Sequence, residues 1–159
     1  MSKIERVKLG IEGLDKFVEG GVPKGSTILL TGSPGTGKTI FSIQFLVYGA
    51  RNGEKGIYIS MEEDVERLKN YMEATFDWEL SKLEKSKKLI FLRTELFDYE
   101  KFKSMIEINV EKLNAERLVI DPITTLSLFF ERPLDIRRSL LDLDRSLKKL
   151  KCTSILTCE

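Results

Sequence analysis

The sequence predicts an α/β fold of three layers, in which a mostly parallel sheet carries helices on both faces. Short apolar runs of strand composition alternate along the chain with longer segments whose apolar residues recur at helical spacing. The strands 57–59 and 118–120 are apolar throughout, as expected where a sheet is buried on both faces. With 159 residues and 42% hydrophobic content, the chain suffices for one compact core, so a single domain over residues 1–159 is expected.

The first predicted strand, 26–30, leads through a glycine-rich turn into a strongly apolar helix that includes Ile40 and Val47. Arg51-Asn52-Gly53 ends this helix, because a glycine after the last turn takes the left-handed conformation that closes many helices. The later strands are predicted at 56–60, 89–92, 118–121 and 153–157.

Three helices are predicted between these later strands. The acidic run 62–64 favours a helix start, because carboxylates stabilise the positive N-terminal end. Asp98 is a typical N-cap for the next helix. Apolar residues from Ile136 to Leu150 recur at 4-3-4-3 spacing, which predicts the last helix and its packing on the sheet, although the same pattern fits a short coiled coil.

The turn after the first strand satisfies the motif G-x-x-x-x-G-K-[ST], with a strand before it and a helix after it as the motif requires. Average residue frequencies make a chance match in such a chain rarer than about one in a hundred. The matching residues are Gly32-Ser33-Pro34-Gly35-Thr36-Gly37-Lys38-Thr39. The sequence therefore predicts that this loop binds a nucleoside triphosphate, with ATP and Mg²⁺ as the first expectation.

Each residue type in the loop suits phosphate chemistry. Glycines let backbone N–H groups approach phosphate oxygens, and the following helix adds partial positive charge. Lys38 is expected to bridge β- and γ-phosphate oxygens, and Thr39 to place its hydroxyl on Mg²⁺. Asp121, at the end of the strand 118–121, fits the second magnesium residue, although a strand-end aspartate is also a common turn former or helix cap.

Hydrolysis also needs a base that orients water toward the γ-phosphate. Glu62 and Glu63 follow the strand 56–60 directly, at the sheet edge where the phosphates are expected. Their chemistry alone leaves two interpretations open: a catalytic pair, or carboxylates that only favour a helix N-terminus.

Taken together, these segments resemble the RecA-like ATPases, and most closely their KaiC-like and RadA-like branch. The resemblance covers the whole chain, and the order of its motifs is more specific than any one motif. The matching segments are Gly10-Ile11-Glu12-Gly13-Leu14-Asp15, Gly20-Gly21-Val22-Pro23-Lys24-Gly25, Ser60-Met61-Glu62-Glu63, Phe76-Asp77-Trp78-Glu79-Leu80 and Ile120-Asp121-Pro122-Ile123-Thr124.

The resemblance implies a RecA-like P-loop NTPase core in which Glu62 and Glu63 act with Lys38 in catalysis, and Thr39 and Asp121 hold Mg²⁺. It also implies that the strand 153–157 inserts between the phosphate-loop strand and the Asp121 strand, so that Thr157 or Glu159 becomes a candidate γ-phosphate sensor. Family members continue beyond the position of Glu159. The chain is thus expected to lack their C-terminal part, as a short paralogue or as a fragment, and to leave the phosphate-loop strand as an exposed edge for a partner subunit to cover.

Composition excludes several classes of function. The net charge of +1 gives no global attraction to nucleic acid or to an anionic membrane, and no apolar run approaches the roughly 20 residues of a membrane span. With no histidine in the sequence, histidine-ligated metals and histidine bases are excluded. Cys152 and Cys158 are expected to be reduced and to serve packing, and a cytoplasmic location is expected.

Two further segments have competing interpretations. The basic residues of 137–151 are interleaved with aspartates such as Asp144, which can pair with Lys148 and favour a solvated helical face over a DNA-binding one. Phe129 and Phe130 are expected to pack against the last helix rather than to contact a partner.

The sequence as a whole favours a KaiC-like ATPase that binds Mg²⁺ and ATP, hydrolyses it slowly to ADP and phosphate, and couples nucleotide state to assembly as a homo-oligomer or with a related subunit. Two alternatives remain: a nucleotide-dependent interaction module without hydrolysis, and a RadA-like or RecA-like protein of DNA recombination or repair. Contact with nucleic acid has no support in the residues, and no membrane contact is expected.

Overall fold

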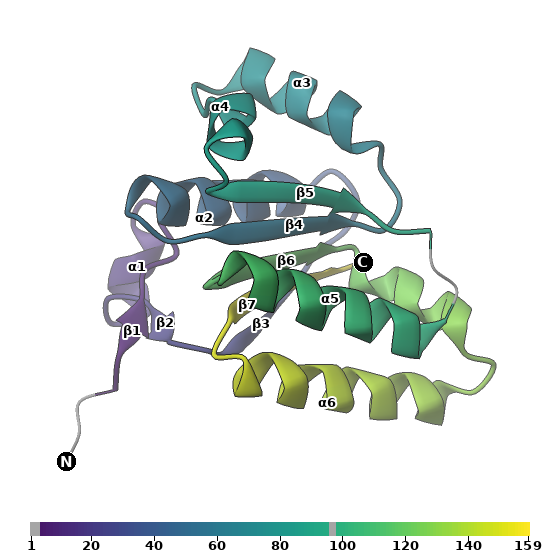
Figure 1. The fold of residues 1–159 in the computed structure, drawn as a ribbon. Helices are drawn as coiled ribbons and strands as arrows, with labels where there is room; N and C mark the ends of the chain where they lie inside the picture. Colours follow the sequence, from purple (N-terminus) through teal and green to yellow (C-terminus); the bar gives the residue numbers. More distant parts are fainter. Residues whose placement is uncertain (1–3, 96–97) are drawn as a thin grey trace.

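The structure is a computed structural model that describes residues 4–95 and 98–159 (Figure 1). Its centre is a five-stranded sheet in which every neighbouring pair of strands is parallel. Across the sheet the strands follow the order β3 (Thr27–Thr31), β7 (Thr153–Cys158), β6 (Arg117–Asp121), β4 (Gly56–Ser60) and β5 (Leu89–Arg93). All five strands predicted from the sequence are present, with ends that agree to within one residue.

Helices cover both faces of this sheet, so the predicted three-layer α/β fold is confirmed (Figure 1). One face carries α2 (Lys38–Arg51), α3 (Val65–Thr75) and α4 (Leu80–Lys85). The opposite face carries α5 (Tyr99–Leu113), the 3₁₀ helix η1 (Ile123–Phe129) and α6 (Pro133–Lys149). No helix was predicted from the sequence at the position of the short helix α4.

Two hydrophobic cores form because side chains alternate between the faces of each strand. Ile57, Ile59, Leu118 and Ile120 face α5 and α6, whereas Tyr58 and Val119 face α2. The same alternation determines toward which face of the sheet the last residue of each strand points. Asp121 lies two positions after Val119 and shares its face, which is the face of α2 and of the phosphate loop.

Local sequence signals position the helices that flank the site. The carboxylate of Asp64 accepts a hydrogen bond of 2.8 Å from the backbone N–H of Arg67, and that of Asp98 accepts one of 2.9 Å from Lys101. Both are N-caps, as predicted for Asp98. Gly53 closes α2 with a φ of 88°. The last helix begins at Pro133, three residues before the predicted apolar pattern.

An N-terminal unit precedes the sheet, and sequence analysis did not predict its elements. It contains the antiparallel pair of β1 (Arg6–Val7) and β2 (Val22–Pro23) and the short helix α1 (Leu14–Phe17). The carboxylate of Asp15 accepts hydrogen bonds from the N–H groups of Leu9, at 2.6 Å, and Gly10, at 2.9 Å. These bonds fix the chain against Tyr48 of α2, whose ring leaves no room for a side chain at Gly10.

Strand β7 lies between β3 and β6, as the resemblance implied, and β3 is an edge strand of the described sheet (Figure 1). Leu29 on β3 is 59% exposed. Cys152 is buried, and both cysteines belong to or pack against the core beneath α5 and α6, in agreement with a packing role. Within the described residues, no helix is long and apolar enough to cross a membrane.

The aromatic pair after β6 packs against the core, but its ring partners lie on α5 and not on the last helix, where the sequence predicted them. The ring of Phe129 contacts Phe102 at 5.8 Å between centroids, and that of Phe130 contacts Tyr99 at 5.7 Å. On α6, Lys148 pairs with Asp144 at 2.7 Å, which confirms the predicted pair and leaves this helix with a mixed solvated face.

Candidate functional site at the phosphate loop

The loop between β3 and α2 has the conformation that its glycines predict. Gly35 has a φ of 79° and Gly37 a φ of 89°, in the left-handed region that disfavours other residues. Gly37 is also the N-cap of α2 and has no side chain to cap it, so the first N–H groups of the helix are available to an anion. The loop is closed internally by the hydroxyl of Thr36, which donates to the carbonyl of Ser33 at 2.8 Å.

Lys38 folds back over the loop. Its Nζ donates to the carbonyl oxygens of Gly32, at 2.6 Å, and Ser33, at 3.0 Å, and lies 3.9 Å from a carboxylate oxygen of Glu159. Only 9% of this side chain is exposed. The ammonium group is therefore held at the loop by neutral carbonyls and one distant carboxylate, and phosphate oxygens carrying full charge are stronger acceptors than these carbonyls.

The Asp121 carboxylate accepts hydrogen bonds from three hydroxyl groups. Its Oδ2 receives the hydroxyls of Thr39 and Tyr58, each at 2.7 Å, and its Oδ1 receives the hydroxyl of Thr157. Thr39 and Asp121 are separated by 82 positions in the sequence, and the sheet brings their side chains into contact. The hydroxyl of Thr39 and the carboxylate of Asp121 are hard oxygen ligands of the kind that Mg²⁺ prefers, so these two residues fit the predicted ion.

Burial and the negative charge of Asp121 raise the pKa of Tyr58 well above the ordinary value for a tyrosine. The phenol therefore keeps its proton and acts as a donor to Asp121 under all physiological conditions.

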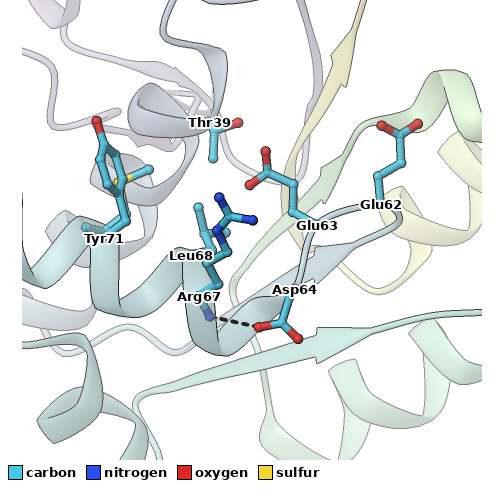
Figure 2. A pocket seen from close by; sticks show the side chains of 8 residues that line it. Thr39, Glu62, Glu63, Asp64, Arg67, Leu68 and Tyr71 are labelled. Carbon is cyan, nitrogen blue, oxygen red and sulfur yellow. Dashed lines mark hydrogen bonds between the residues drawn. The ribbon is translucent and has the colours of Figure 1, made fainter.

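The two glutamates after β4 differ in their contacts. The hydroxyl of Thr125 donates to Oε1 of Glu62 at 2.7 Å, which ties Glu62 to η1. The side chain of Glu63 points toward Thr39, and that of Glu62 points away from it (Figure 2). The hydroxyl of Ser60 donates to the backbone carbonyl of Glu63 at 2.6 Å and holds this turn. The geometry thus distinguishes two residues that the sequence treated as a pair.

Two adjoining cavities lie beside these residues. One, of about 440 Å³, is lined by the phosphate loop, Asp121 and Glu159. The other, of about 530 Å³, extends from Thr39 along α3, where Arg67 and Tyr71 line it (Figure 2). Four residues line both cavities: Thr39, Glu62, Glu63 and Tyr71. The cavities therefore form a continuous depression that leads from the loop to the outer helix.

Most of the residues predicted from the motifs meet in the cavity at the loop. They are Pro34, Gly35, Gly37, Lys38, Thr39, Glu62, Glu63 and Asp121. Gly32, Ser33 and Thr36 shape the loop from outside the lining. Of the two candidate sensors, Glu159 lines this cavity, whereas the hydroxyl of Thr157 is bonded to Asp121.

Sequence reasoning missed Tyr58, Arg67, Tyr71 and Thr125. Each could have been found only through the pairing of distant strands or the placement of α3 and η1. The roles of all the site residues in binding and catalysis stay predictions.

The fold and the loop define the RecA-like class of P-loop ATPases. A family model described as the KaiC ATPase matches residues 7–159, and the chain belongs to this family. A KaiC-like protein from Pyrococcus horikoshii has a crystal structure that matches 99% of this chain and 71% of its own length, with a TM-score of 0.89 and 41% identity.

Curated relatives are also similar to this chain over nearly its whole length. A UPF0273 protein from Pyrococcus furiosus is 37% identical over 96% of this chain and 67% of its own length. The circadian clock oscillator protein KaiC from Prochlorococcus marinus is 32% identical over 99% of this chain and 33% of its own length. The chain thus spans about two thirds of the UPF0273 relatives and one third of that KaiC protein.

Proposed function

We propose that this chain is a Mg²⁺-dependent ATP-binding domain that hydrolyses ATP slowly and couples nucleotide state to assembly. The observation that carries the proposal is the contact of 2.7 Å between the hydroxyl of Thr39 and the carboxylate of Asp121, directly beside the phosphate loop. Two oxygen donors from distant parts of the sequence meet where the triphosphate is expected. Membership of the KaiC ATPase family supports this interpretation.

In this proposal the loop N–H groups and Lys38 hold the β- and γ-phosphates, and Thr39 and Asp121 hold the metal ion. When bound, Mg²⁺ would supply positive charge that offsets the charge of the phosphates. Glu63 points toward Thr39 and is the candidate for orienting the attacking water (Figure 2). Glu62 is hydrogen-bonded to Thr125, so a movement of Glu62 when nucleotide binds would also move η1.

The second cavity suits the ribose and the base. Tyr71 is 60% exposed and lines both cavities, so its ring is accessible for stacking. Arg67 lines the same cavity and adds a planar cation that can stack on a purine. The nucleotide would then extend from the loop toward α3.

Slow hydrolysis is expected from the charges at the loop. Among the described residues that line the phosphate cavity, Lys38 is the only basic one. Phosphoryl-transfer enzymes gain about three to five orders of magnitude in rate from an additional arginine near the γ-phosphate. A second copy of the chain, or a related subunit, would have to supply that charge, and this requirement is what would couple turnover to assembly.

The presence of only one basic residue, Lys38, in the described lining of the phosphate cavity also favours a second candidate, a nucleotide-dependent interaction module without hydrolysis. A recombination or repair protein acting on DNA has no comparable support, because carboxylates of α6 pair with nearby basic residues, as Asp135 does with Arg132 at the N-cap and Asp144 with Lys148.

The proposal is tested by measuring ATP binding and phosphate release on the same preparation. We expect binding of a fluorescent ATP analogue that strengthens with Mg²⁺, and a turnover well below about 1 per second. Glu63→Gln should reduce any measured turnover by about 100-fold and leave binding intact, whereas Glu62→Gln should have the smaller effect. Absence of nucleotide binding by the folded chain would refute the proposal, and binding without any phosphate release would leave only the interaction module.

A further inference from the structure

The Asp121 carboxylate is held by side chains from three different elements. Thr39 belongs to α2, Tyr58 to β4 and Thr157 to β7. Only Thr39 is part of the phosphate loop. Tyr58 and Thr157 are almost fully buried, at 1% and 0% exposed, and Asp121 is 9% exposed. Tyr58 and Asp121 both contribute to the lining of the cavity at the loop.

The register of the sheet explains why these side chains meet. Tyr58 pairs with Val119, and Ser60 pairs with Asp121, so Tyr58 stands one pleat behind Asp121 on the neighbouring strand. Side chains two positions apart share a face, which places Tyr58 and Asp121 together on the side of α2. Thr157 follows Ile155 by two positions on β7 and shares that face as well.

The Tyr58 ring is itself fixed in place. It packs against Phe91 of β5, with 5.6 Å between the ring centroids, and it is enclosed in the core beneath α2 and α3. Its hydroxyl carries one proton and directs it to Oδ2 of Asp121, the oxygen that also receives Thr39. A rigid donor thus controls the orientation of a carboxylate whose other side faces the cavity.

We infer that Tyr58, together with Thr157, is a positioning residue that orients the Asp121 carboxylate for a metal–nucleotide complex. The inference rests on the proposed function of this site. Neither hydroxyl would contact the metal ion; both would set the direction in which Asp121 presents its oxygens. Partners of this kind typically change metal affinity or activity by about 10- to 100-fold when they are removed.

A purely structural role is the competing explanation, since any buried hydroxyl needs a partner. The chain contains a matched control for it. Tyr99 is also buried, and its hydroxyl also donates to a carboxylate, that of Asp142 at 2.9 Å, between α5 and α6 and on the opposite face of the sheet. Thr153 is a control for Thr157, because it is equally buried on β7 but its hydroxyl oxygen accepts from the N–H of Gly25.

The test is a Mg²⁺ titration of fluorescent-ATP binding to the complete chain, with binding in excess chelator as the metal-free reference. Tyr58→Phe should raise the Mg²⁺ concentration at half-saturation by about tenfold and leave metal-free binding unchanged. Tyr99→Phe should match the wild type in both. Thr157→Val should shift the Mg²⁺ midpoint in the same direction as Tyr58→Phe, and Thr153→Val should not.

If folded Tyr58→Phe has the same Mg²⁺ midpoint as the wild type, the inference is overturned. It is also overturned if Tyr58→Phe and Tyr99→Phe shift the Mg²⁺ midpoint equally. If Tyr58→Phe fails to fold, the pair Thr157→Val and Thr153→Val decides in the same way. A wild-type chain whose nucleotide binding ignores Mg²⁺ would instead refute the proposed function itself, which separates the two failures.

Discussion

Strand β6 carries a buried charge at each end, and the two charges have opposite surroundings. Arg117, at the amino end, is 1% exposed; its side chain is bonded to Glu54 and to the carbonyl of Phe45 and lies 4.5 Å from the centroid of the Phe45 ring. Asp121, at the carboxyl end, is held by hydroxyls yet lines a cavity. The first charge is sealed by protein partners, and the second is open toward a ligand.

This difference separates a structural charge from a functional one. A buried charge with a complete set of partners costs stability when one partner is removed, and it has no capacity left for a ligand. A carboxylate that is oriented by neutral donors and faces a cavity retains its charge for a cation. The comparison predicts that substitution of Arg117 lowers the free energy of unfolding, whereas substitution of Asp121 weakens Mg²⁺-dependent ATP binding.

The largest effect is expected from Arg117→Met. It leaves Glu54 and the Phe45 carbonyl without their donor, and we expect the free energy of unfolding to fall by about 3 kcal/mol. Urea denaturation measures this change. Arg145→Met, on the exposed face of α6, is the control and should stay within about 0.5 kcal/mol of the wild type. A similar loss in both variants would contradict the special role of Arg117.

A somewhat smaller effect is expected from Asp121→Asn, and on a different quantity. The substitution keeps the volume and removes the charge, and the hydroxyl that faces the new NH₂ group must turn to accept from it. Mg²⁺-dependent ATP binding should therefore weaken by roughly 100-fold, which is about 2.7 kcal/mol. The free energy of unfolding should change by less than about 1 kcal/mol. Isothermal titration with and without Mg²⁺ measures the first quantity; unchanged Mg²⁺ dependence would remove Asp121 from the metal site.

The cavity along α3, which is lined by Arg67 and Tyr71, allows binding of the base to be compared with binding of the phosphates. Tyr71→Ala should weaken ATP binding by about tenfold, because stacking on an aromatic ring contributes about 1–3 kcal/mol per base. Binding of inorganic triphosphate should be unchanged. Phe17→Ala is a suitable control, because Phe17 is 88% exposed. Tyr48→Ala is not suitable, because the ring of Tyr48 packs on Gly10. Equal losses for ATP and triphosphate would place the base elsewhere.

The smallest effect concerns Asp142, a partly exposed carboxylate that lies outside the candidate site. A hydrogen bond from Lys103, and one from Tyr99, lower the pKa of Asp142 below its ordinary value. The resulting stabilisation is present above about pH 4 and is lost as pH falls through the lower folded-state pKa. Because this carboxylate is 45% exposed, we expect no more than about 1 kcal/mol. Lys103→Met should flatten the pH dependence of unfolding in this range; an unchanged profile would contradict it.

Much of the fold could be predicted from sequence because its signals are local. Apolar runs predicted the five strands, and Gly53 and Asp98 marked helix ends through their own backbone or side-chain chemistry. The phosphate loop was predictable for the same reason, since one contiguous motif contains its chemistry. The antiparallel pair of β1 and β2 was missed because these strands have two residues each and no periodicity to detect.

The rest of the site depends on contacts that sequence separation conceals. Tyr58 is one residue of an apolar strand, and only its register with β6 directs its hydroxyl to a carboxylate 63 positions away. Arg117 directly precedes the predicted apolar run 118–120, and the absence of a side chain at Gly49 lets it lie buried against α2. The different contacts of Glu62 and Glu63 likewise follow from Thr125 on η1.

The central claim is tested most directly by the free energy of unfolding, measured by urea denaturation with and without Mg²⁺ and ATP. At a free ligand concentration of about 100 times the dissociation constant, the wild type should gain about 2.7 kcal/mol. Arg117→Met should start lower and gain the same amount, whereas Asp121→Asn should start level with the wild type and gain much less. An equal gain in Asp121→Asn, or no gain in the wild type, would contradict the account.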